Sequence, residues 1–136
     1  MVEIKVSKDS KDILEYANAA IKHRLYVNSW SILRILKKVV QGNGVVNPPT
    51  IALAYTFDNI PVGICILRAG ELHTFVRKLF RKGGIGKALV KSLVKPHDNP
   101  PCVFGGIKGS DIFYRKCFRK ENWTHVMWNS GVEWRI

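Results

Sequence analysis

The chain has 136 residues and a mass of 15.4 kDa, which is the size of one domain with a sizeable core. Hydrophobic residues make up 46% of the chain and are spread along it, which argues against disorder, and no apolar run approaches the roughly 20 residues of a membrane-spanning helix. A net charge of +12 points to phosphate-bearing partners, either a nucleotide-like cofactor or a nucleic acid.

Apolar periodicity predicts elements in the order β-α-α-β-β-β-α-β-α-β-β. Ser7 and Asp9 can cap the first helix, Gly42 and Gly44 can end the second, and Pro96 stops the third. With no internal repeat or linker, we expect one mixed α/β domain over residues 1–136. In chain order, the predicted elements are a strand at 2–6, a helix at 10–25, a helix from about 29–31 to 40, strands at 51–57, 61–67 and 72–76, a helix from the glycine turn to 95, a strand at 102–107, a helix at 111–119 and a closing hairpin around 129–131.

A basic glycine turn lies between the strand at 72–76 and the helix that follows it. Gly83, Gly84 and Gly86 fall within four residues, and seven Lys or Arg residues lie between positions 77 and 95. Glycines at a helix N-terminus let an anionic ligand approach the unpaired amide N–H groups, where the helix dipole favours negative charge. The turn is therefore interpreted as a phosphate cradle.

The spacing of this turn excludes two familiar phosphate loops. A Walker A loop requires Gly and then Ser or Thr at the positions of Arg81 and Ala88, and a dinucleotide fingerprint requires Gly at Leu89. The GXXG loop of KH-type RNA-binding domains fits better, but that module places a helix before the loop, where residues 72–76 predict a strand.

Residues 81–86, RKGGIG, resemble the R/Q-x-x-G-x-G/A motif with which the GNAT acetyltransferase superfamily binds the pyrophosphate of acetyl-CoA. The preceding strand ends at Val76, five residues before Arg81. About 30 residues further on, FYRKCF at 113–118 is similar to the Phe-Tyr-x-Lys-x-Gly-Phe segment of that family. The resemblance covers nearly the whole chain and implies a GNAT-like α/β fold, with a mostly antiparallel sheet of six to seven strands flanked by about four helices.

The resemblance also implies acetyl-CoA as the cofactor and a role for each matching residue. Backbone groups near Phe75 and Val76 would pair with the pantetheine arm, and Tyr114 would give a proton to the leaving thiolate. Glu71 is the first candidate for the base and His73 the second, since alternate strand residues share one face, here with Phe75. The amides that would hold the pyrophosphate belong to Arg81, Lys82, Gly83, Gly84, Ile85, Gly86 and Lys87, and the Lys82 or Lys87 side chain could reach an outer phosphate.

Three functions follow as hypotheses. The first is direct transfer of an acetyl group to an amine of a small molecule or a protein. The second is acetylation of an aminoacyl-tRNA or another nucleic-acid-bound target, favoured by the charge of +12 and by Trp123, Trp128 and Trp134. The third is a non-catalytic GNAT-like or RNA-binding module, because residues 107–108 replace an Asn that the family often has and the Gly before Phe118 is missing.

Other features of the sequence limit the partners and the compartment. The three cysteines show no CxxC spacing and the N-terminus has no apolar signal-peptide block, so we expect a reduced, cytoplasmic protein without a metal site. Charge complementarity favours an acidic protein or tRNA as the acceptor. The resemblance implies that specificity for the acceptor comes from the first two helices and the final hairpin. Nothing in the sequence indicates an oligomeric state.

Overall fold

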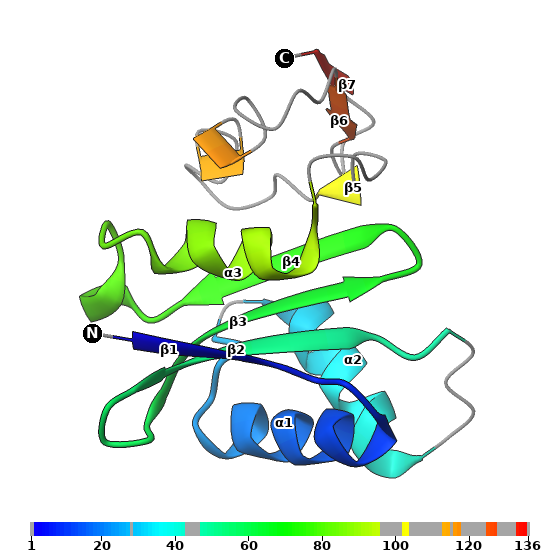
Figure 1. Cartoon of the computed structure of the whole chain (residues 1–136). Helices are drawn as coiled ribbons and strands as arrows, with labels where there is room; N and C mark the ends of the chain where they lie inside the picture. The colour runs from blue at the N-terminus through cyan, green and yellow to red at the C-terminus, as the bar shows by residue number, and fades with distance from the viewer. Residues whose placement is uncertain are drawn as a thin grey trace.

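The computed structural model describes residues 2–27, 29–42, 47–95, 102–103, 113–114, 116–117, 125–127 and 133–135. Their elements are β1 (Val2–Val6), α1 (Ser10–Lys22), α2 (Trp30–Gln41), β2 (Thr50–Thr56), β3 (Pro61–Arg68), β4 (Glu71–Val76), the 3₁₀ turn η1 (Lys78–Phe80), α3 (Ile85–Leu93), β5 (Cys102–Val103), β6 (His125–Met127) and β7 (Glu133–Arg135). Helices α1 and α2 cover one face of the sheet formed by β1 to β4, and α3 covers the other (Figure 1).

The strands pair in chain order. Strands β1, β2, β3 and β4 form three successive antiparallel pairs, so the predicted hairpin of 51–57 with 61–67 is confirmed. Strand β4 then pairs parallel with β5, β5 parallel with β6, and β6 antiparallel with β7. The mixed α/β architecture is confirmed by this arrangement. The full count of six to seven strands and about four helices stays a prediction, because much of the chain after residue 95 lies outside the described residues.

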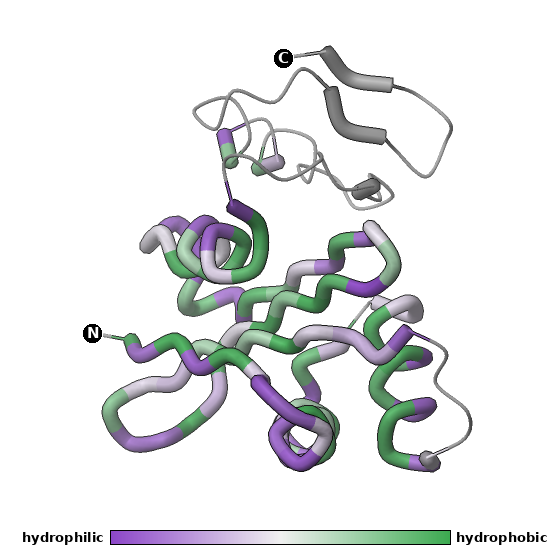
Figure 2. Tube along the Cα trace, turned by 45° about the vertical axis from the view of Figure 1, so that its right-hand side comes forward, coloured by the Kyte–Doolittle hydropathy of each residue, from purple (hydrophilic) through white to green (hydrophobic). Residues whose placement is uncertain are grey.

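Side chains of the central strands alternate between two hydrophobic clusters, as the period of a strand requires. Ile51 of β2 and Ile64 of β3 pack with α1 and α2, whereas Ala52 lies in the cluster under α3. A Cβ added at Gly63 of β3 would stand 3.0 Å from Leu89 Cδ1, so α3 lies close against the sheet. Figure 2 shows hydrophobic residues along the strands between the two helical layers.

Helix α1 ends at Lys22, three residues before the predicted end at Leu25. Arg24 adopts a left-handed conformation with φ 54, and its N–H donates to the Ile21 carbonyl at 3.1 Å. The N–H of Leu25 donates to the Ala20 carbonyl at 2.9 Å, which completes a Schellman motif. Leu25 is fully buried. Its helical spacing therefore comes from the hydrophobic contact that accompanies this type of helix end, not from another helical turn.

Asp9 caps α1, and Ser7 does not. The Asp9 carboxylate accepts a hydrogen bond from the Asp12 N–H at 2.9 Å, while the Asp12 carboxylate accepts one from the Lys8 N–H at 3.1 Å. Ser7 continues the pairing of β1 with β2 instead. Its N–H donates to the Ile51 carbonyl and its hydroxyl accepts from the Ile51 N–H, each at 2.8 Å.

The other two described helices end close to their predicted limits. Gly42 caps the C-terminus of α2 with φ 65, as its position after the last apolar residue predicts, while Gly44 lies outside the described residues. Helix α3 ends at Leu93, two residues before the predicted limit. Within the part of the chain that the structure describes, no helix combines the length and the apolar character needed to cross a membrane.

Candidate functional site

The glycine turn connects β4 to α3 through η1 and two residues in the left-handed region. Lys82 has φ 69, and Gly84, the N-cap of α3, has φ 83. Left-handed residues between residues of other conformation turn neighbouring N–H groups toward one side, where an anion can lie. The first helical hydrogen bond joins the Ala88 N–H to the Gly84 carbonyl at 3.0 Å, and no side chain caps this end. The N–H groups of residues 85–87 therefore lie ahead of the first helical bond.

Arg81 ties this turn to the end of β4. Its Nε donates to the Val76 carbonyl at 2.8 Å, and its guanidinium carbon lies 5.7 Å from the centre of the Phe75 ring. Its backbone N–H donates to the Lys78 carbonyl at 3.3 Å. Because the Arg81 amide already has a partner inside the turn, the amides best suited to bind a phosphate are those of residues 82–87. Arg81 fixes the turn in place.

The three glycines of the turn serve three different purposes. Gly84 needs its left-handed conformation, which other residues adopt at a cost. Gly86 needs its small size, since an added Cβ would stand 2.8 Å from Phe113 Cε1. Gly83 is under neither constraint: its φ is not positive, and an added Cβ would meet only the Phe80 carbonyl oxygen, at 3.9 Å. The fold tolerates a side chain at this position, so a glycine here leaves the turn open to a ligand.

Replacing Gly86 with alanine should destabilise the fold by about 1–3 kcal/mol, because the new methyl group overpacks against the ring of Phe113. The matched change Gly83→Ala should shift the free energy of unfolding by no more than about 0.5 kcal/mol. Urea unfolding of the two variants beside the parent chain tests both values. Equal stability of all three proteins would show that α3 does not pack on Phe113 in this way.

A hollow of about 560 Å³ adjoins the turn. Gly83 and Gly84 lie along one side of it, and Ile4 of β1 lies along another. Two large apolar side chains at its rim are highly exposed, with 86% of Phe57 and 93% of Leu79 open to solvent. Its volume falls within the roughly 300–1,000 Å³ of small-molecule sites, so the turn faces space that a ligand can enter.

Tyr114 lies on the α3 face of the sheet. Its hydroxyl donates to Thr74 Oγ1 of β4 at 3.2 Å, and only 4% of the residue is exposed. Thr74 Oγ1 also lies 3.5 Å from the Cys65 Sγ. Burial raises the pKa of Tyr114 well above its usual value, although the hydrogen bond with Thr74 lowers it in part. Tyr114 therefore keeps its proton at neutral pH and can act as a donor.

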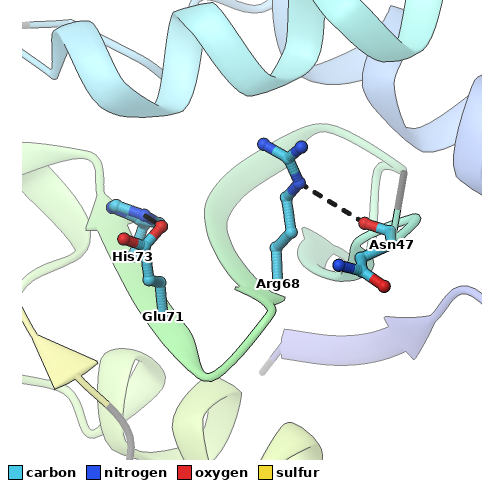
Figure 3. Close-up of polar contacts among 4 residues, drawn as sticks. All are labelled: Asn47, Arg68, Glu71 and His73. Carbon is cyan, nitrogen blue, oxygen red and sulfur yellow. Dashed lines mark hydrogen bonds and ion pairs between the residues drawn. The ribbon is translucent and has the colours of Figure 1, made fainter. Parts of the chain in front are cut away.

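Glu71 and His73 lie on the other face of β4, toward α2 (Figure 3). The Glu71 side chain is 47% exposed, whereas that of His73 is 7% exposed. Glu71 Oε2 stands 4.0 Å from His73 Nε2. Phe75 packs in the cluster of α1 and α2, so the prediction that these three residues share one face is confirmed. Burial lowers the pKa of His73 more than the nearby carboxylate raises it, which makes the imidazole neutral at pH 7.

The structure brings Glu71 and His73 together but sets Tyr114 apart from them. Thr74, the partner of Tyr114, alternates with His73 along β4. The candidate bases and the candidate acid Tyr114 therefore lie on opposite faces of one strand. The sequence did not reveal Thr74 as the partner of Tyr114. The available signal was strand alternation, which places Thr74 on the face of the 72–76 strand opposite Glu71 and His73. Parallel pairing with β5 at Glu71 and Leu72 further places the start of β4 inside the sheet.

The stability of the fold should decrease as the pH falls below about 6.5, the ordinary pKa of histidine. His73 has a lowered pKa in the folded chain, so the unfolded chain binds more protons between the folded value and 6.5, and protonation there favours unfolding. Urea unfolding at pH 7.5 and pH 5 should show a smaller difference for His73→Gln than for the parent chain. The same difference in both proteins would rule out His73 as the source.

Three cationic residues near Glu71 were not predicted from the sequence as part of the site. Arg34 and Lys38 of α2 and Arg68 at the end of β3 line a hollow together with Glu71 and His73. The four-residue spacing of Arg34 and Lys38 was the available signal, since it puts both on one helical face.

Some sequence predictions fall outside the described residues. They concern positions 107–108, Trp123 and Trp128, whereas Trp134 is described only as a backbone position of β7 and Cys117, the residue before Phe118, is buried in the core. For the predicted helix at 111–119, the residues that the structure describes are helical, namely Phe113, Tyr114, Lys116 and Cys117.

No family model and no curated protein matches the sequence. Among solved structures, the chain is similar to a ribosomal-protein-alanine N-acetyltransferase from Brucella melitensis biovar Abortus 2308, with 18% identity, a TM-score of 0.41 and coverage of 95% of this chain and 79% of that one. It is similar to a possible acetyltransferase from Clostridium difficile 630, with 14% identity, a TM-score of 0.47 and coverage of 90% of each chain. A third match is apo-form YjaB from Escherichia coli, with 16% identity, a TM-score of 0.34 and coverage of 68% and 63%. The solved proteins that this chain is similar to thus include acetyltransferases, and at TM-scores below 0.5 its function has to be inferred from its own residues.

Proposed function

We propose that the chain is an acetyl-CoA-dependent N-acetyltransferase that moves an acetyl group directly to an amine. The observation that carries the proposal is the turn at 82–87. There Gly83, which the fold does not require to be glycine, lies beside amides that precede the first helical hydrogen bond of α3. Residues 77–95 contain seven Lys or Arg and no acidic residue, so the surroundings of the turn also favour a phosphate.

The residues present fit a pyrophosphate with a pantetheine arm. Amides of residues 82–87 would hold the phosphates, with the Lys82 and Lys87 side chains as outer partners. Backbone groups at Phe75 and Val76 would bind the arm along β4, next to the turn that Arg81 holds. When bound, acetyl-CoA supplies the acetyl thioester, so that a bond from the amine nitrogen to the acetyl carbon forms as the carbon–sulfur bond breaks.

Side chains of this chain would move the two protons of that reaction. Glu71, or His73 beside it, accepts the proton that the amine loses, and the neutral imidazole of His73 is suited to this at pH 7. Tyr114 donates a proton to the leaving sulfur and regains one from solvent. Because Glu71 and Tyr114 lie on opposite faces of β4, a reaction that uses both would take place along the edge of β4 beyond Leu72, the last β4 residue that pairs with β5 among the described residues.

The same proposal includes a GNAT-like sheet of six to seven strands with about four helices, a single domain over residues 1–136 and a cytoplasmic location. Calorimetric titration with acetyl-CoA and with CoA tests it first, and saturable binding of both is expected. Transfer to a panel of small amines and acetylatable peptides, followed by mass spectrometry, tests the reaction. Absence of binding to either nucleotide would refute the proposal, and binding without any transfer would leave a non-catalytic GNAT-like module.

Acetylation of an aminoacyl-tRNA is the second candidate, favoured by the net charge of +12, which exceeds what one cofactor needs. Affinity for tRNA should then fall steeply as salt increases, since phosphate contacts release counterions. A filter-binding series from 50 to 200 mM salt measures this. Indifference to tRNA at low salt would remove this candidate and leave the small-molecule and protein acceptors.

A further inference from the structure

A second hollow, of about 260 Å³, lies between α2 and the hairpin of β3 and β4. Helix α2 contributes residues at positions 31, 34, 35 and 38, which form one helical face. Ile35 anchors this face in the core with 7% exposure. The polar lining consists of Ser31, Arg34, Lys38, Arg68, Glu71 and His73.

The hollow carries an excess of positive charge. Arg34 and Lys38 reach it from α2 and Arg68 from β3, and Glu71 of β4 is its only carboxylate among the described lining residues. With His73 neutral, three cations against one carboxylate leave two positive charges in excess. Like charges around one small hollow repel one another, and a bound anion relieves this repulsion.

A backbone carbonyl of the loop before β2 orients the Arg68 side chain. Its Nε donates to the Asn47 carbonyl at 3.4 Å, and its side chain extends on the same side of the hairpin as Glu71 and His73 (Figure 3). The cations therefore gather beside the two candidate bases, whereas a merely solvated charged face would spread them apart.

We propose that this hollow is the acceptor site and that the acceptor is a small amine that also carries a carboxylate or a phosphate group. The inference rests on the proposed acetyl transfer, with Glu71 or His73 as the group that accepts the amine proton. Arg34, Lys38 and Arg68 bind the anionic group and so position the amine near Glu71. The volume of about 260 Å³ lies below the roughly 300–1,000 Å³ of drug-sized sites, which favours a small molecule over a macromolecular segment.

Binding of two matched pairs of amines tests the anion preference without any cofactor. O-phosphoethanolamine is compared with ethanolamine, and β-alanine with β-alaninamide, by NMR titration of the whole chain at low salt. In at least one pair, the anionic member should bind about tenfold or more tightly, and its affinity should fall as salt increases. The pair that shows the difference tells phosphate from carboxylate. Equal affinity within both pairs would overturn the inference.

Variants on α2 locate the site. Arg34→Gln and Lys38→Gln should each weaken binding of the preferred anionic amine about 2- to 5-fold, since partly exposed ion pairs are weak, and the double variant about tenfold. Lys37→Gln is the matched control, because Lys37 is exposed on the same helix but does not line the hollow. An equal loss in the control would attribute the binding to overall charge and overturn the inference.

Steady-state kinetics separates this inference from the proposed function. In the double variant, the KM for the anionic amine should rise, while the Kd for acetyl-CoA stays unchanged. Acetyl-CoA turnover with no preference among the amines would overturn the acceptor class alone. Anion binding at the hollow without any acetyl-CoA binding would overturn the acetyl transfer and with it the acceptor role. Transfer to tRNA or to an acidic protein, with none to the small amines, would also overturn the inference.

Discussion

Replacing Gly83 with glutamate should weaken acetyl-CoA binding by about 100-fold or more while leaving the fold as stable as before. The new carboxylate would stand among amides that otherwise face an anion, and like charges brought together at a binding site cost several kcal/mol. A 100-fold loss corresponds to about 2.7 kcal/mol. Stability should change by no more than about 0.5 kcal/mol, because the backbone at Gly83 is not left-handed and an added Cβ meets only the Phe80 carbonyl oxygen, at 3.9 Å.

Gly83→Gln is the matched control, since glutamine has nearly the same shape and no charge. It should weaken binding about tenfold, by hindering approach to the amides of residues 82–87 without repelling the phosphates. Calorimetric titration gives the affinities and urea unfolding gives the stabilities. Unchanged affinity in the glutamate variant would place the cofactor elsewhere, and a large loss of stability in both variants would show that the fold needs a glycine at this position.

Local patterns in the sequence predict the strands, the glycine turn and most helix limits, because each depends on neighbours along the chain. The end of α1 is an exception. Leu25 keeps helical spacing from the apolar residues before it, and the same spacing suits the buried residue that follows a Schellman motif. Only the left-handed conformation of Arg24 distinguishes a continued helix from a Schellman motif, and arginine is not a residue type that favours this conformation.

The candidate site was likewise predictable only where it depends on neighbours along the chain. Alternation along β4 correctly predicts that Glu71 and His73 share a face, because it is a local property. The partner of Tyr114 is Thr74, 40 residues earlier, and the cationic hollow joins α2 to the hairpin of β3 and β4. Both depend on how helices pack on the sheet. Spacing within β4 or α2 shows which residues share a face, but it does not show which residues of another element that face contacts.

Replacing Tyr114 with phenylalanine should lower kcat by about 100-fold or more, the loss expected when a positioned proton donor is removed. The hydroxyl keeps its proton at neutral pH because burial raises the pKa of Tyr114, and the same rise makes it a weaker acid than an ordinary tyrosine. The same hydroxyl donates to Thr74 Oγ1 at 3.2 Å, so the change should also reduce stability by about 0.5–1.5 kcal/mol. A fall in kcat could therefore come from chemistry or from a loosened core.

Thr74→Val separates the two causes, because it removes the partner and keeps the Tyr114 hydroxyl. Its stability loss should equal or exceed that of Tyr114→Phe, since both delete this hydrogen bond and the valine variant also loses the contact of Thr74 Oγ1 with Cys65 Sγ. If Tyr114 supplies the proton, kcat should fall far more in the phenylalanine variant than in the valine variant, with acetyl-CoA affinity alike in both. Urea unfolding measures the stabilities, initial rates at saturating substrate measure kcat, and calorimetric titration measures the acetyl-CoA affinities. A loss of kcat no larger in the phenylalanine variant than in the valine variant would instead make Tyr114 a core residue and would leave the leaving sulfur to take its proton from water.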